Sequence, residues 1–188
     1  MLKNMSAALL LATMTAIVSS PATALQTVVT QVDKNTDGTM TYHFAIKLDQ
    51  GDSLSPSDAK AKGDFVTVYN FYGLVEGSAK APAGWEFSSE EFGRTPTLNG
   101  YPMVLPVDVP NTPNLTWTVT KPVTGGEQID GFTATTRVST TVQGAYSAQV
   151  TRQSPAVQGV AASGEGAKGS KQALIGALPT PSFLVELK

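Results

Sequence analysis

The chain has 188 residues, no cysteine, one histidine, 15% charged residues and a formal net charge of -2. Without cysteine it can form neither disulfides nor thiolate metal sites, and a single histidine excludes metal centres built from several imidazoles. The small negative charge gives no general attraction for nucleic acid or anionic membranes. Threonine, glycine and proline are frequent and charge is sparse, which favours strands and turns over surface helices.

The N-terminus has the pattern of an export signal. Lys3 precedes an apolar stretch from Ala7 to Val18, which is shorter than the roughly 20 residues that cross a bilayer. Ala22-Thr23-Ala24 then forms a small-x-small cleavage site. We expect residues 1–24 to be a signal peptide cleaved near Ala24, with the product secreted, either extracellular or periplasmic. An uncleaved N-terminal anchor is the alternative, and no transmembrane segment is expected in the mature chain.

The remaining length suits one domain with a single core, and strand patterns dominate it. Apolar and polar residues alternate with a period of two in short runs separated by turn residues, which is typical of half-buried strands. Strands are expected at Val28–Val32, Thr39–Leu48, Phe65–Leu74, Trp85–Phe87, Leu115–Val119, Phe132–Val142 and Tyr146–Val150. About seven or eight such strands predict an all-β, antiparallel two-sheet β-sandwich, Ig-like or jelly-roll-like, over residues 25–153.

Two stretches do not fit this alternation. Tyr101–Pro113 contains four prolines and is expected to be a surface connection, because proline cannot donate to a central ladder. Residues 154–182 are rich in glycine, alanine and serine and are expected to form a loop or linker. A last strand is expected at residues 183–188, which either folds back on its own domain or adds to the sheet edge of a neighbouring molecule.

The order of strand and turn residues over roughly Gly63 to Val142 resembles bacterial exported proteins of the PEP-CTERM type, whose function is unknown. The resemblance lies in the segments Gly63–Phe71, Leu74–Ser78, Ala81–Trp85, Thr95-Pro96, Val109–Trp117 and Gly131–Ala134. It implies a cell-surface or matrix component and brings no catalytic residues. The C-terminus, Phe183–Lys188, departs from the pattern because it has no Pro-Glu-Pro tag, so tag-dependent anchoring is not expected.

The loop Asp33-Lys34-Asn35-Thr36-Asp37-Gly38 matches the first half of a calcium loop, with oxygen ligands at Asp33, Asn35 and Asp37. The twelfth position is Phe44, where a bidentate glutamate should stand. Asn and Asp also favour turns because they hydrogen-bond their own backbone. The preferred interpretation is a plain hairpin turn, and a weak calcium site is the alternative. No cofactor is expected.

Catalytic patterns are weak in this chain. His43 is the only imidazole, and no serine lies in a Gly-x-Ser-x-Gly nucleophile context. Glu90 and Glu91, with Glu86 nearby, are the densest acidic cluster, but neighbouring strand residues point to opposite faces. We expect a solvated acidic loop and a protein that is not an enzyme. A secreted hydrolase would require two carboxylates facing each other across a pocket.

Aromatic residues remain as candidate ligand contacts. Trp85, Tyr72 and Tyr101 could stack on sugar rings if their faces were exposed, whereas core packing is the interpretation that the alternation around Trp117 favours. The sequence thus predicts a non-catalytic secreted or cell-surface component that acts through protein or glycan contacts. The alternatives are a small carbohydrate-binding module and a self-assembling surface subunit. Extracellular polysaccharide or other surface proteins are the expected partners, and nucleic acid is not.

Overall fold

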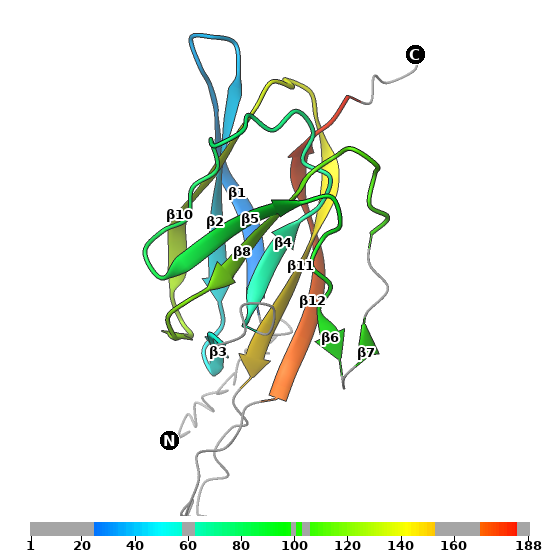
Figure 1. The fold of residues 1–188 in the computed structure, drawn as a ribbon. Helices are drawn as coiled ribbons and strands as arrows, with labels where there is room; N and C mark the ends of the chain where they lie inside the picture. The colour runs from blue at the N-terminus through cyan, green and yellow to red at the C-terminus, as the bar shows by residue number, and fades with distance from the viewer. Residues whose placement is uncertain (1–24, 58–62, 99–100, 103–105, 153–169, 184–188) are drawn as a thin grey trace, which may run out of the picture.

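Two antiparallel sheets face each other in the computed structural model of this protein, which describes residues 25–57, 63–98, 101–102, 106–152 and 170–183 (Figure 1). The smaller sheet has the order β1-β2-β10, and the larger has the order β5-β8-β4-β11-β3-β9, with β12 paired to β11. The strands of the two sheets are β1 (Leu25–Lys34), β2 (Met40–Leu48), β3 (Asp52–Leu54), β4 (Phe65–Val68), β5 (Trp85–Glu90), β8 (Asn114–Val119), β9 (Val123–Thr124), β10 (Gln128–Thr136), β11 (Thr141–Arg152) and β12 (Ser170–Pro181). A separate pair consists of β6 (Thr97–Leu98) and β7 (Tyr101–Pro102).

The expected β-sandwich is therefore confirmed. The described residues contain twelve strands and no helix, and eight of these strands have four residues or more. The four shorter strands lie in connections that the sequence pattern assigns to loops. The described residues contain no helix that is long and apolar enough to cross a membrane.

The core lies between the two sheets and is rich in aromatic rings. Trp117 of β8 contacts Phe44 of β2 and Phe132 of β10, with ring centroids 5.4 and 5.6 Å apart. All three side chains are at most 1% exposed. Their burial follows from the period-two alternation of their strands, and each contributes roughly 2–3 kcal/mol through apolar area removed from water.

The segment between β4 and β5 covers the outer edge of β10. The Lys80 amide donates to the Thr133 carbonyl at 2.9 Å, the Thr133 amide donates back at 3.2 Å, and the Val75 amide donates to the Thr135 carbonyl at 2.8 Å. Strand edges without such cover are templates for unwanted pairing. This connection thus closes one side of the sandwich without adding a full strand.

Two expected strand boundaries are wrong. The strand beginning at Phe65 ends at Val68 and not at Leu74, because Asn70 adopts a left-handed conformation with φ 52° and turns the chain. The expected strand from Phe132 to Val142 is divided by a turn after Thr136. Gln143 and Gly144, which separate the expected strands Phe132–Val142 and Tyr146–Val150, lie inside β11.

The loop expected over residues 154–182 is also wrong where the structure describes it. Residues 170–181 form β12, which pairs with β11 over twelve positions without a register shift. Pro179 and Pro181 lie two residues apart, so their nitrogens point to the same side of β12, and an edge strand has one side free of ladder bonds. Phe183 lies after β12 and is not in a strand. The rest of the expected strand at 183–188 falls outside the described residues, as do residues 153–169.

Candidate functional site

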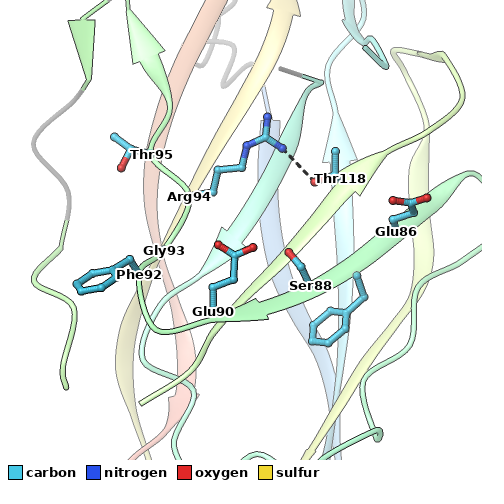
Figure 2. Close-up of a pocket in the computed structure, with 9 residues that line it drawn as sticks. Glu86, Ser88, Glu90, Phe92, Gly93, Arg94, Thr95 and Thr118 are labelled. Carbon is cyan, nitrogen blue, oxygen red and sulfur yellow. Dashed lines mark hydrogen bonds between the residues drawn. The ribbon is translucent and has the colours of Figure 1, made fainter. Parts of the chain in front are cut away.

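A hollow of about 570 Å³ lies beside β5, the outermost strand of the larger sheet (Figure 2). Along β5, Trp85 points into the core while Glu86, Ser88 and Glu90 alternate with the inward positions. After Glu90 the chain turns back over the outside of the sheet. The hollow is bounded by Glu86, Ser88, Glu90, Phe92, Arg94 and Thr118, among others.

Arg94 holds the returning segment against the sheet. Its guanidinium donates to the Thr118 hydroxyl at 3.0 Å and to the Gly63 carbonyl at 2.7 Å, and its Cζ lies 4.0 Å from the centroid of the Phe65 ring. Cation–π contact and two hydrogen bonds together fix the side chain. Burial lowers the pKa of Arg94, while the charges of Asp64 and Glu90 act in the opposite direction.

Hydroxyl groups in or just after strands of the larger sheet hold the backbone of the same segment in place. Tyr69 and Ser147 both donate hydroxyl hydrogens to the Arg94 carbonyl, at 3.1 and 3.3 Å, and these two hydroxyls are 2.8 Å apart. Burial raises the pKa of Tyr69 to about 12, and the charge of Asp108 acts in the same direction. Gly93 lies against the Tyr69 ring, where a Cβ atom would overlap it. The wall of the hollow is thus a preorganised loop.

The hollow presents mainly oxygen-bearing groups. The carboxylate of Glu90 and the hydroxyl of Ser88 lie on the same side of β5 as the Arg94 guanidinium (Figure 2). Phe92 is 71% exposed and lies at the rim. Carboxylate and hydroxyl groups that converge beside an exposed aromatic ring can hydrogen-bond a polyhydroxylated ligand and cover its apolar face.

The two glutamates of β5 are not placed as a hydrolytic pair. Glu86 and Glu90 are four residues apart on one strand, which separates their Cα atoms by about 13 Å at the usual strand rise. Glycoside hydrolases place their two carboxyl groups about 5–9.5 Å apart. The expectation that the protein is not an enzyme stays a prediction.

Of the three aromatic residues singled out above, Trp85 does not present an exposed ring face. Trp85 is 8% exposed and packs edge-to-face on Phe132 with ring centroids 4.9 Å apart, so its ring faces the core. Tyr72 is half-buried, and its ring packs edge-to-face on Phe183 with ring centroids 5.5 Å apart. Tyr101 lies in β7, and its side chain falls outside what the structure describes.

The loop at 33–38 forms the turn between β1 and β2. Asp37 accepts hydrogen bonds from the amide and hydroxyl of Thr39 at 3.0 and 2.7 Å, and the Asn35 amide group donates to Thr39 and Thr41. Asp33 instead faces His43, with Oδ2 3.0 Å from Nε2. The three residues of the alternative calcium site, Asp33, Asn35 and Asp37, thus have separate partners. The part of the chain that the structure describes has no group of three His, Asp or Glu side chains placed for a metal.

Asp33 and His43 form a solvent-exposed pair on the outside of the smaller sheet. The two side chains are 45% and 37% exposed. The pKa of Asp33 is lowered mainly by a hydrogen bond from Gln31. The hydrogen bond and the charge interaction with His43 lower it further, by less. The single imidazole therefore lies outside the hollow beside β5.

Sequence reasoning missed Arg94, Ser88 and Phe92 as members of one site. The expected strand ends at Phe87, so the shared face of Glu86, Ser88 and Glu90 follows only from the full extent of β5. The position of Arg94 depends on the chain reversal after β5. Comparison with protein-family models, curated proteins and solved structures found no match to this chain. The resemblance to exported PEP-CTERM-type proteins therefore remains a prediction.

Proposed function

We propose that this protein is a non-catalytic extracellular binding module that uses the hollow beside β5 to hold a neutral glycan. The observation that carries the proposal is that Glu90, Ser88 and Arg94 line one hollow together with the exposed Phe92 (Figure 2). The protein acts after export, as its N-terminal pattern indicates, and serves as a matrix or envelope component. This function uses contact alone and requires no cofactor.

The charges of the hollow favour a neutral ligand. Glu86, Glu90 and Arg94 give the lining a formal net charge of −1, and the Arg94 guanidinium already donates to Thr118 and Gly63. A carboxylate oxygen that accepts from vicinal hydroxyls gives a charge-assisted hydrogen bond, which is stronger than a neutral one. Anionic polysaccharides would be repelled by the same carboxylates.

Binding to three polysaccharides tests the proposal: cellulose as a neutral polymer, chitin as an acetamido polymer and alginate as an anionic one. The chain from Leu25 to Lys188 is incubated with each, and the bound fraction is measured in a depletion assay. We expect binding to cellulose or chitin and none to alginate. Glu90→Gln should weaken binding about tenfold, which corresponds to roughly 1.4 kcal/mol, the lower end for a hydrogen bond to a charged group.

Glu76→Gln provides the matched control, because Glu76 is exposed in the connection between β4 and β5 and outside the hollow. The control variant should bind as the unmodified chain does. An equal loss of polysaccharide binding in Glu90→Gln and Glu76→Gln would show that the net charge of the protein, and not the hollow, governs binding. Binding to alginate alone, or to none of the three polymers, would overturn the proposal of a neutral-glycan site.

A further inference from the structure

Three side chains from different parts of the larger sheet form a closed ring of contacts. The Lys171 ammonium on β12 lies 2.5 Å from Oδ1 of Asp64 and donates to the Thr151 hydroxyl at 2.8 Å. That hydroxyl on β11 donates in turn to Oδ2 of Asp64 at 2.8 Å. Thr151 and Lys171 are direct partners in the β11–β12 register, so the strand pairing itself brings the amine to the carboxyl group.

The carboxyl group in this ring is held rigidly and away from solvent. Asp64 is 0% exposed, and its Oδ2 also accepts a hydrogen bond from the Ser55 amide at 2.8 Å. Its backbone is fixed by bonds to Ser55 and from Val119. The contact of Lys171 Nζ with Oδ1 holds the amine next to this carboxyl group. Two groups held together in this way react as parts of one molecule, which raises their effective concentration by orders of magnitude.

We propose that Lys171 and Asp64 condense into an intramolecular isopeptide bond. One proton first passes from the Lys171 ammonium through the Thr151 hydroxyl to Oδ2 of Asp64, which gives a neutral amine and a carboxylic acid whose hydroxyl oxygen is Oδ2. The amine lone pair then forms the Nζ–Cγ bond, while an amine proton passes to the Thr151 oxygen and the Thr151 proton passes to Oδ2. The Cγ–Oδ2 bond breaks and one water leaves. Thr151 is regenerated, and no oxidant or other reactant is consumed.

The surrounding charges are compatible with the neutral product. A buried carboxylate and an ammonium each carry a desolvation cost, which the amide removes. Arg94, whose charge acts on Asp64, keeps its own bonds to Thr118 and Gly63 when the carboxylate is consumed. A second pair in the same sheet, Arg152 with the buried Asp52, has similar exposure but a guanidinium in place of the amine, and therefore serves as an unreactive comparison.

The bond would close a loop between residues 107 positions apart and tie the last described strand to the sheet. The chain has no cysteine and so no disulfide that could do this. A cross-link over so long a loop stabilises mainly by restricting the unfolded chain. This inference is independent of the glycan proposal, because the ring of contacts shares no residue with the hollow beside β5.

Intact-mass measurement of the purified, unmodified chain tests the proposal, after its N-terminus has been determined. We expect a mass lower than that of the sequence by one water. Trypsin cleaves after lysine, so the cross-link should yield one branched peptide that joins Gly63–Lys80 to Gly169–Lys188, uncleaved at Lys171. A mass equal to that of the sequence, or linear Gly63–Lys80 as the sole form of that peptide, would overturn the proposal.

Lys171→Arg is the matched variant, because arginine retains the positive charge and the contact with Asp64 but does not condense. Its mass should equal that of its sequence, and its thermal unfolding should occur at a lower temperature. A water deficit that persists in Lys171→Arg would place the lost water elsewhere in the chain and would also overturn the proposal. The unmodified chain decides the question even if the variant does not fold.

Discussion

At the scale of single residues, the most constrained positions lie beneath the segment that returns over the larger sheet. Tyr69 illustrates this, since its hydroxyl is shared between Ser147 and the Arg94 carbonyl while its ring supports Gly93. A buried phenol in such a position must remain neutral, because the phenolate would lose its hydration without gaining a cation partner. The segment is therefore sensitive to alkaline pH.

We expect the free energy of unfolding to fall as pH rises from about 10 toward 12. The pKa of Tyr69 is raised to about 12 in the folded protein, against about 10 in the unfolded chain. The folded state thus holds its proton where the unfolded state releases it, so this stabilisation is complete below pH 10 and is lost above it. Burial also raises the pKa values of Tyr42 and Tyr146, which contribute in the same direction.

Urea unfolding of the unmodified chain and of Tyr69→Phe at pH 8 and pH 11 measures this effect. At pH 8 the variant should be less stable by about 1–1.5 kcal/mol, the usual value of a lost hydrogen bond. At pH 11 the difference should narrow, because phenylalanine has no proton to retain. A difference that is the same at both pH values would contradict the raised pKa of Tyr69.

At the scale of elements, the sequence predicts strands where alternation is strict and misplaces them where pairing decides. Leu115, Trp117 and Val119 alternate with threonines, and β8 lies where this pattern indicates. Gln143 and Gly144 resemble a turn, yet β11 runs through them because β12 pairs with both positions. No local signal in Gln172–Thr180 has a period of two, so β12 becomes evident only from its partner.

The candidate site also combines residues of one strand with contacts between residues that are far apart in the sequence. Glu86, Ser88 and Glu90 share a face because β5 continues to Glu90, beyond the expected end of the strand at Phe87 and into the expected acidic loop. The burial of Trp85 depends on Phe132, 47 positions further along the chain, and the position of Arg94 depends on contacts with Gly63 and Thr118. Such long-range contacts could not be read from one sequence.

Removal of β12 tests whether residues 170–181 belong to the domain. A chain ending at residue 169 loses the entire ladder on one side of β11 and exposes β11 as an unprotected edge. We expect this truncation to accumulate as insoluble protein or to elute as large aggregates in size-exclusion chromatography. A chain ending at Phe183 retains β12 and should remain soluble and folded by circular dichroism. Equal behaviour of both truncations would contradict the assignment of β12 to the sheet.

At the scale of the whole molecule, the start of the domain is set by the core. Leu25 is the first residue of β1 and is 1% exposed, and its carbonyl lies 3.5 Å from the Tyr146 hydroxyl. A chain beginning at this residue contains every described strand in full. The position also follows directly on the expected cleavage site at Ala24, which stays a prediction.

N-terminal sequencing of the exported protein should therefore start at Leu25. A recombinant chain starting at Thr27 lacks the buried Leu25 side chain and should be less stable by about 2–5 kcal/mol, the usual cost of removing a buried leucine side chain. Chemical denaturation of the two chains measures the difference. Equal stability, or an exported form that begins beyond Thr27, would contradict the role assigned to Leu25.

The course of the first and last described strands has a mechanical consequence. β1 and β12 run in the same direction in Figure 1, so the start of β1 lies below the end of β12. A pull applied between the start of β1 and the end of β12 acts along the strands and shears the β11–β12 ladder, whose twelve residue pairs share the load at once. The hydrogen bonds would thus have to break together and not one after another. A cell-surface domain loaded in this direction would transmit tension before it yields.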